Sequence, residues 1–491
     1  MIRWLTDLEL MPMQEWQYER LAAAGSRTLY KGRKHMEAIY EQSQDKKVRL
    51  STTEKLSYGI GDCGANVIVA LASSFLTGYY TDTVGVAAAA IGTMMLLCRV
   101  FDGITDLIMG AIVDKTKSKY GKARPWLLWT APLMGISLFL IFNVPASLGA
   151  TGKLIYIYLT YIFQNCIIYT ANNLPYNALL SRMTLDVQDR AQTASIRFVM
   201  TQVTSLITNV ITANLIASVG WRSISAIYGT VACVMCVLCF LGVREHVDAE
   251  DDGTVKVERV PLSKALPALF KNKYFFIQAL MFMFLYINVV TTGSMTYYFC
   301  NSVLGNIAFL SWTSVAGTVP AMIVNLMMPG LVAKFGKRKL MITGATIMAI
   351  GSCIIGAAGS NLPLVVLGLI VKGFGTGPIM SGIFATTADV VDYGEWKTGV
   401  RSEGLVNSCT SFGMKVGIGL GSAICTWIIA IGGYVGTAEV QTEAALASIR
   451  FGYGYFGAIL SLVVLALCII MNIDKHIDQI QRDLEAKRSM A

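Results

Sequence analysis

Charged residues are scarce in this sequence. Asp, Glu, Lys and Arg make up only 14% of the 491 residues, whereas a typical soluble domain contains about 25%. That is too little charge to cover the surfaces of the roughly three soluble domains that a chain of this length would form. The same composition, with 54% hydrophobic residues, excludes a disordered chain, a coiled coil and a collagen-like fibre. The hydrophobic side chains are therefore expected to face lipid.

Neither histidine nor cysteine occurs in an arrangement that would support catalysis or metal binding. The three histidines, His35, His246 and His476, lie in hydrophilic segments, which excludes a histidine proton relay within a membrane. All 11 cysteines lie in apolar stretches, where a thiol acts as a small hydrophobic side chain. No histidine stands near the cysteine trio at 233, 236 and 239, and no nucleophile–base pair occurs in the apolar stretches. We therefore expect neither an enzyme nor a bound cofactor.

Twelve stretches of the chain are long and apolar enough to cross a bilayer as helices, for which about 20 mostly apolar residues are needed. They comprise residues 57–81, 86–113, 125–147, 153–180, 198–219, 224–243, 275–300, 306–333, 340–358, 363–391, 404–434 and 445–472. The sequence therefore predicts an all-α integral membrane protein with twelve transmembrane helices.

The positions of the basic residues predict the orientation. If the amino terminus lies inside, 34 of the 40 Lys and Arg residues fall in cytoplasmic segments. This bias places both termini in the cytoplasm, with the chain in the plasma (inner) membrane, and it explains the net charge of +9 without nucleic acid. The expected parts are a tail at 1–56, a six-helix half at 57–243, a cytoplasmic loop at 244–274, a second six-helix half at 275–472 and a tail at 473–491.

The two halves repeat a sequence pattern. Residues 109–124, after the second stretch, and 328–339, after the eighth, both run Met, three residues, Val and then a short basic turn with Gly-Lys. The basic character of cytoplasmic loops explains the charges but not this order. The pattern predicts two duplicated six-helix halves, as in major facilitator transporters.

Three ionisable residues lie within the second apolar stretch. Arg99, Asp102 and Asp106 are spaced i, i+3 and i+7, which places them on one face of a helix. An ionisable group costs at least about 2.5–3.5 kcal/mol at the centre of a membrane helix, so each is a functional candidate. Two carboxylates one turn apart repel unless a cation or a shared proton lies between them, and Thr105 offers a further oxygen. Arg99 alone would neutralise only one carboxylate, so we predict a coupling-ion site with Arg99 as its charge partner.

Polar residues in the first and fourth stretches are candidates for binding a sugar. Asp62 and Asn66 lie one turn apart on a glycine-rich helix, where they could bind a polyol or satisfy neighbouring helices. Asn173, Tyr176 and Asn177 flank a proline in mid-helix, which is tolerated where a helix lines a cavity. Their amides and phenol suit sugar hydroxyls, although such groups also hold helices together.

Three further groups of charges have candidate functions. Arg197, at the inner end of the fifth stretch, suits sugar hydroxyls or a substrate carboxylate. Lys415, deep in the eleventh, is either a substrate contact or a counter-ion for the second-stretch carboxylates. The loop after the tenth stretch carries charges of both signs, which either form gating contacts between the halves or are ordinary solvated charges. These loop residues are Asp389, Asp392, Glu395, Arg401 and Glu403.

Four segments closely resemble a known family. Residues 99–110, 119–126, 173–176 and 388–397 are similar to the glycoside–pentoside–hexuronide:cation symporters, the melibiose permease group of the major facilitator superfamily. The resemblance runs in order from about residue 55 to 472 and implies the major facilitator fold of two pseudo-symmetric six-helix halves.

The resemblance also implies roles for individual residues. It places the site for Na⁺, Li⁺ or H⁺ on Asp102 and Asp106, with Thr105 where melibiose permease has an Asn, and with Thr170 near the cation. Arg197 and Lys415 match basic residues of the family. Three positions depart from melibiose permease, which has Asp, Asp and Trp there to bind galactosides, so the resemblance implies another sugar. These positions are Asn66, Asn173 and Asn177.

The expected function is symport of a glycoside, pentoside or hexuronide, coupled to Na⁺ or H⁺, by alternating access between the halves. The coupling ion is the only inorganic partner expected, and no obligate protein partner is expected. Two alternatives remain at this point. One is symport of another amphiphile such as a lysolipid, and the other is a membrane sugar sensor that does not transport.

Overall fold

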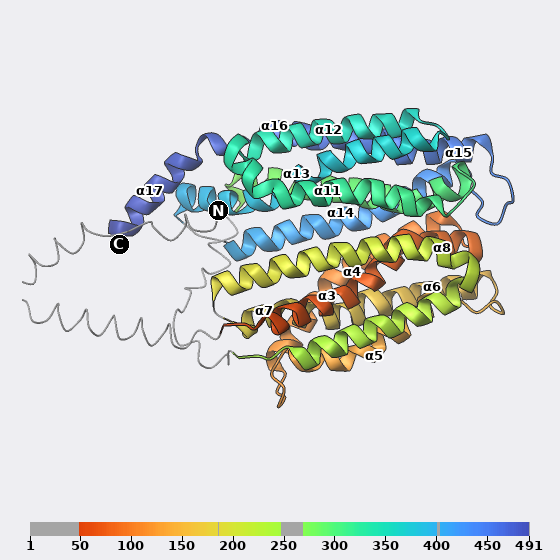
Figure 1. Cartoon of the computed structure of the whole chain (residues 1–491), viewed down its shortest axis with the longest axis horizontal. Coiled ribbons are helices and arrows are strands. Elements are labelled where there is room, and N and C mark those ends of the chain that lie inside the picture. The colour runs from red at the N-terminus through yellow and green to blue at the C-terminus, as the bar shows by residue number, and fades with distance from the viewer. Residues whose placement is uncertain (1–48, 185, 247–268, 400–402, 491) are drawn as a thin grey trace, which may run out of the picture.

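The computed structural model describes residues 49–184, 186–246, 269–399 and 403–490. Within these ranges the chain forms a bundle of long, roughly parallel and antiparallel helices (Figure 1). The first half contains α3 (Thr52–Leu71) with η1 (Ala72–Leu76) and η2 (Tyr79–Thr83), α4 (Ala88–Lys115), α5 (Arg124–Ile141), α6 (Ala150–Ile162) with η3 (Phe163–Tyr169) and α7 (Thr170–Met183), and α8 (Val187–Gly242). The second half contains α10 (Lys273–Tyr298) with η4 (Phe299–Val303), α11 (Phe309–Phe335), α12 (Lys337–Ala357), α13 (Leu362–Thr398), α14 (Glu403–Ile431), and α15 (Glu443–Arg450) with η5 (Phe451–Tyr455) and α16 (Phe456–Ile470).

The prediction of twelve membrane-crossing helices is confirmed. In the described residues, 11 helical segments are long and apolar enough to cross a membrane. The remaining crossing is α4, which has 28 residues and carries the three ionisable residues of the second apolar stretch. α8 contains two crossings, Gln188–Ile216 and Ser218–Gly242, with a non-helical kink at Gly220 near the start of the second. Gly220 has a φ of 71°, a conformation that a residue without a side chain adopts at little cost.

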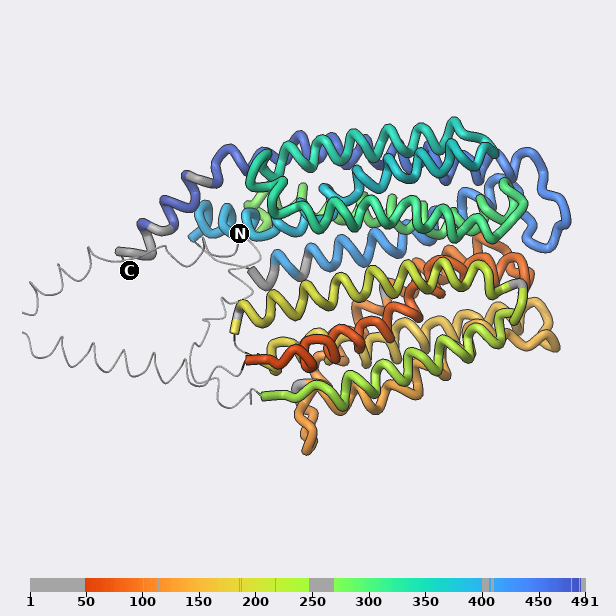
Figure 2. Tube along the Cα trace, in the orientation of Figure 1, coloured from red at the N-terminus to blue at the C-terminus, as the bar shows by residue number. Residues whose placement is uncertain are grey.

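The two halves lie side by side along their length (Figure 2). Within the halves, α3 packs on α8 and α12 packs on α13, whereas α4 meets α14 and α8 meets α11 across the boundary between the halves. The start of α3 and the helix α17 (Ile477–Met490) lie at the same end of the bundle, at the left of Figure 1. We call this the terminal end and the other the opposite end. An even number of crossings brings the start of α3 and the end of α16 to the same end of the bundle.

Two segments differ from the sequence-based expectation. The segment 388–403 was expected to be a loop, but α13 continues through Asp389, Asp392 and Glu395 to Thr398. The helix ends only at Gly399, which has a left-handed φ of 71°. The tail at 473–491 forms α17, which packs on the terminal end through the buried Ile480 and Leu484. Residues 1–48 of the expected tail at 1–56, most of the central loop and Arg401 lie outside the described residues.

Candidate functional site

A cluster of four charged side chains joins α4 to α14. The ammonium of Lys415 on α14 forms an ion pair with Asp106 on α4 and lies 3.5 Å from Oδ2 of Asp102. Arg99 Nη1 lies 3.4 Å from the same Asp102 oxygen. We call Arg99, Asp102, Asp106 and Lys415 the charge cluster. Its two cations and two anions balance, so Lys415 supplies the charge that Arg99 alone leaves uncompensated.

The charge cluster lies where the two halves are in close contact. A Cβ atom at Gly419 of α14 would lie only 2.6 Å from Cγ of Arg99. Thr170 of α7 donates a hydrogen bond of 3.1 Å to Oδ1 of Asp102. Thr105 instead donates to the carbonyls of Phe101 and Asp102 in its own helix. Asp102, Asp106 and Thr170 are therefore brought together as expected, and Lys415 adopts the counter-ion alternative.

A second ion pair links the first and fifth crossings. Arg197 Nε on α8 donates to Oδ2 of Asp62 on α3 over 2.7 Å, and the hydroxyl of Thr201 donates to the same oxygen over 3.0 Å. Arg197 Nη1 also donates to Oδ1 of Asn177, at 2.9 Å. The Asp62 carboxylate is buried. This arrangement favours a structural ion pair that fixes Arg197 beside Asn177.

The remaining candidate sugar residues are partly occupied by helix contacts. Tyr176 is buried, stacks on Tyr58 at a centroid distance of 4.5 Å and donates to the Tyr58 carbonyl over 2.6 Å. The Asn66 amide donates to the Asp62 carbonyl one turn earlier. Asn177 donates to Oδ1 of Asn173 over 2.8 Å. Tyr176 is thus used for packing between helices. Asn66, Asn173 and Asn177 are at least partly exposed and can form further hydrogen bonds.

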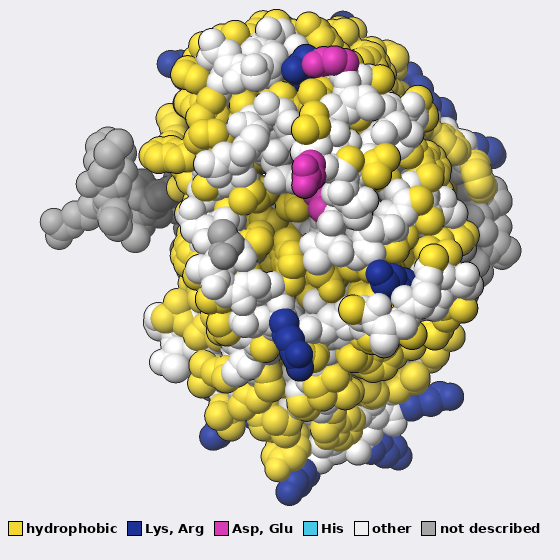
Figure 3. Space-filling view, turned by 90° about the vertical axis from the view of Figure 1, so that its right-hand side faces the viewer, with side chains coloured by type: hydrophobic (Ala, Val, Ile, Leu, Met, Phe, Trp, Pro, Cys, Tyr) yellow, Lys and Arg dark blue, Asp and Glu magenta, His cyan; other side chains and the backbone are white. Residues whose placement is uncertain are grey.

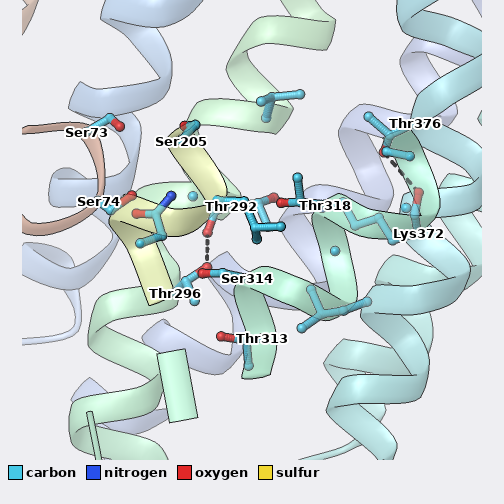
Figure 4. A pocket seen from close by; sticks show the side chains of 18 of the residues that line it. Ser73, Ser74, Ser205, Thr292, Thr296, Thr313, Ser314, Thr318, Lys372 and Thr376 are labelled. Carbon is cyan, nitrogen blue, oxygen red and sulfur yellow. Dashed lines mark hydrogen bonds between the residues drawn. The ribbon is translucent and has the colours of Figure 1, made fainter. Parts of the chain in front are cut away.

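A cavity of about 400 Å³ lies between the two halves, within the roughly 300–1,000 Å³ range of small-molecule sites. Figure 4 shows hydroxyl side chains around it, with Ser73, Ser74 and Ser205 of the first half on one side and Lys372 and Thr376 of α13 on the other. Its wall also holds hydroxyl and amide groups of α8, α10 and α11. These are Gln202, Asn209, Thr292, Thr296, Thr313, Ser314, Thr318 and Asn325.

None of the seven sugar-binding residues expected from the sequence is among the described residues that line this cavity. The sequence reasoning missed its hydroxyl-bearing wall, because single Ser and Thr residues in apolar helices are common and do not form a motif. Lys372 did carry a signal. It is one of the few basic residues that lie away from the ends of the predicted crossings, and an intramembrane lysine is a functional candidate.

Hydrogen bonds between the halves hold the opposite end together. Asp82, after the first crossing, accepts from the Tyr434 hydroxyl at 2.9 Å and from the Asn301 amide at 3.1 Å. The hydroxyls of Thr81 and Tyr298 lie 3.2 Å apart. Figure 3 looks on to this end of the molecule and shows only scattered charged side chains. The contacts close the bundle beyond the cavity on this side.

One of the expected gating residues at the terminal end makes a contact within the second half. Asp389 of α13 forms an ion pair of 2.5 Å with Lys337, which begins α12. This pair links α13 to the Gly-Lys turn whose sequence repeats that of residues 109–124. Asp392 and Glu395 lie on the same helix, and Glu403 begins α14. A gating contact between the halves at this end stays a prediction.

Known proteins are similar to this chain in sequence and in fold. The family model described as MFS/sugar transport protein, where MFS is the major facilitator superfamily, matches residues 57–475. The chain is 30% identical over 450 residues to the isoprimeverose transporter of Lactiplantibacillus pentosus, covering 89% of this chain and 92% of that protein. It is 32% identical over 416 residues to the glucuronide carrier protein homolog of Escherichia coli (strain K12), covering 82% and 88%.

A solved structure has the same fold. A bacterial homolog of the human lysosomal transporter Spinster superposes with a TM-score of 0.64 at 13% identity, covering 87% of this chain and 97% of that one. The expected twelve-helix fold, the resemblance and the expectation that the chain is not an enzyme are thus confirmed. The chain belongs to the MFS sugar transport protein family, as one of its glycoside–pentoside–hexuronide:cation symporters.

Proposed function

We propose that this chain imports a glycoside, pentoside or hexuronide together with Na⁺ or H⁺. The observation that carries the proposal is the position of Lys415, whose ammonium binds Asp102 and Asp106 across the boundary between the halves. The names of the two relatives support a sugar derivative as the substrate. The hydroxyl and amide groups of the cavity wall also support a polyol, because they can donate hydrogen bonds to sugar hydroxyls and accept hydrogen bonds from them.

The coupling ion and Lys415 compete for the same two carboxylates. When ionised, the Asp102 and Asp106 carboxylates only accept hydrogen bonds, and they attract whichever cation is nearest. When Na⁺ or H⁺ binds to them, Lys415 loses its partners and the link between α4 and α14 loosens. Thr170 adds an uncharged oxygen beside Asp102. Ion binding thereby changes a contact between the halves, which is what coupling to a rocking motion requires.

The sugar binds in the cavity between the halves, next to the Asp62–Arg197 pair. Thr201 binds Asp62 and is followed directly by Gln202, a residue of the cavity wall. Arg197 is held by Asp62 and keeps its guanidinium beside Asn177. These contacts connect the polar residues of the first, fourth and fifth crossings to the cavity, although the residues themselves lie outside its wall.

The terminal end is the cytoplasmic one, because most basic residues are predicted to lie there. The contacts of Asp82 with Tyr434 and Asn301 then close the outer side. With this orientation, a state that is closed at the outer side is one from which sugar leaves toward the cytoplasm. Opening to the outside requires these contacts to break and the halves to close at the terminal end.

Uptake by the purified chain in proteoliposomes tests the proposal. Labelled methyl β-glucoside, methyl β-xyloside and methyl β-glucuronide are offered with an inward Na⁺ gradient, an inward H⁺ gradient or neither. We expect at least one glycoside to accumulate above its outside concentration under one of the two gradients. That gradient identifies the coupling ion. Equilibration without accumulation under either gradient would contradict symport, and no uptake of any probe would contradict the substrate class.

A further inference from the structure

Lys372 is a buried cation on the wall of the cavity. It lies on α13 and is only 7% exposed. Its ammonium donates a hydrogen bond of 2.7 Å to the hydroxyl of Thr292 on α10. A lysine ammonium has three N–H donors, so two remain for other partners. Figure 4 shows Lys372 and Thr292 in the same wall as the hydroxyls of Thr296, Ser314 and Thr318.

Three other basic side chains in the crossings have acidic partners. Arg99 and Lys415 pair with the α4 carboxylates Asp102 and Asp106 in the charge cluster, and Arg197 pairs with Asp62. In the part of the chain that the structure describes, no Asp or Glu lines the cavity, and Lys372 is the one charged residue of its wall. A buried cation that no anion compensates is costly, so its retention at a binding cavity points to a ligand that supplies the negative charge.

Thr292 holds the ammonium in a defined position. Its hydroxyl oxygen accepts from Lys372, and its own proton points to Oδ1 of the buried Asn288, 3.5 Å away. Asn288 is fixed in turn by donating to the Gly457 carbonyl over 2.8 Å and to the Ser461 hydroxyl over 3.0 Å. This chain of hydrogen bonds anchors Lys372 through uncharged groups and leaves its positive charge uncompensated.

We propose that Lys372 is an anion-binding position in the cavity, and that the substrate is an acidic sugar derivative carrying one carboxylate or sulfonate. The hydroxyl and amide groups of the wall bind the ring hydroxyls, while Lys372 binds the acidic group. The inference rests on the proposed function and narrows its substrate class. A carboxylate and a sulfonate each carry one negative charge, which is what Lys372 requires. The glucuronide and the 6-sulfonate probes below distinguish the two groups.

The test compares probes that differ only at carbon 6. Proteoliposomes are given labelled methyl β-glucuronide, methyl β-glucoside or the 6-sulfonate analogue, under the gradient that drives uptake. The expected result for the unmodified chain is a preference of about tenfold or more in kcat/KM for one acidic probe over the glucoside. Lys372→Met is expected to abolish this preference, with glucoside uptake changing by less than about threefold, and Lys372→Arg to retain most of it.

A second variant and a control separate charge from folding. Thr292→Val keeps the charge of Lys372 but removes the hydroxyl that accepts its hydrogen bond. This variant is expected to weaken the preference for the acidic probe less than Lys372→Met does. It also tests the inference if Lys372→Met fails to fold. Lys334→Met removes an exposed lysine at the terminal end of α11 and should leave the preference unchanged.

The outcomes distinguish this inference from the proposed function. If the unmodified chain accumulates the glucoside as well as the acidic probes, or if Lys372→Met and Thr292→Val both keep the full preference, the anion-binding position is wrong and sugar symport stands. If no probe accumulates under either gradient, the proposed function fails and this inference fails with it.

Discussion

Lys415 of α14 is paired with Asp106 of α4, and this ion pair bridges the two halves of the molecule. Four charges meet there in a helix interface, where each alone would be costly. In the proposed mechanism, Lys415 compensates the carboxylates until the coupling ion binds, and then gives them up. The pair therefore connects ion binding to the contact between the halves, and most of the following predictions concern it.

Replacing Lys415 should strengthen ion binding and weaken coupling. In Lys415→Gln the carboxylates of Asp102 and Asp106 lose their competing cation, so the apparent affinity for the coupling ion should rise about tenfold. Accumulation of sugar should fall, because ion binding no longer breaks a contact between the halves. Titration of sugar binding with the coupling ion measures the first effect. An unchanged or lower ion affinity would show that Lys415 does not compete for the site.

A methyl group at Gly419 should disturb the charge cluster through packing alone. In Gly419→Ala the new Cβ would lie 2.6 Å from Cγ of Arg99, so the Arg99 side chain or α14 must move. Coupled uptake should fall severalfold while the charges stay unchanged. The matched control is Gly103→Ala on α4, since nothing lies within 4 Å of a Cβ there. Equal activities of the two variants would contradict a tight joint between α4 and α14.

The Asp62–Arg197 pair should be a strong stabilising contact. Asp62→Asn leaves the guanidinium of Arg197 without its acidic partner and should lower the free energy of unfolding by about 3 kcal/mol, the usual cost of breaking a buried pair. Arg197→Gln should cost a similar amount, and the double variant less than the sum. Thermal unfolding in detergent gives the comparison. Additive losses would mean that the two residues do not act as a pair.

The closed opposite end should depend on pH through Asp82, which lies beyond the crossing Thr52–Leu76. Burial raises the pKa of the Asp82 carboxyl above its usual range, although hydrogen bonds from Thr81 and Tyr434 oppose the rise. A raised pKa means that the closed form binds the proton more tightly than the open form. The added stability of closure is therefore present at low pH and is lost as pH rises through the raised pKa.

Hydrogen exchange of residues 79–87, corrected for the intrinsic pH dependence, measures this closure. Protection should decrease from pH 5 to pH 8 in the unmodified chain. Asp82→Asn stays neutral and can still accept from Tyr434, so its protection should remain high at both pH values. The same pH dependence in Asp82→Asn as in the unmodified chain would assign the effect to another group.

The sequence predicted the crossings and the grouping of Arg99, Asp102 and Asp106 because both follow from local rules. Twenty apolar residues must form a helix in lipid, and residues at i, i+3 and i+7 share a helix face whatever the tertiary structure. The end of α13 was misplaced because a charged segment was taken for a loop. Its helix continues through Asp389, which pairs with Lys337, and ends only at Thr398.

The partners of distant residues could not be predicted in the same way. Nothing local in the sequence states that Lys415 lies against Asp106, 309 residues away, or that Arg197 binds Asp62. The cavity wall was missed for the same reason, since its hydroxyls come from helices of both halves and only the packing brings Thr292 to Lys372. Tyr176 was taken for a sugar contact, whereas its stacking on Tyr58 turns it toward a helix interface.

The most direct test of the account compares two modes of transport by the Asp102→Asn variant. This variant keeps the shape of the side chain but removes one of the two charges that hold the coupling ion. Exchange of labelled for unlabelled sugar across the membrane needs only the cavity and the motion of the halves, whereas accumulation needs the ion as well. Glu439→Gln, at an exposed position after α14, is the control for loss of a carboxylate. The account predicts that Asp102→Asn retains exchange and loses accumulation, and intact gradient-driven accumulation in this variant would contradict it.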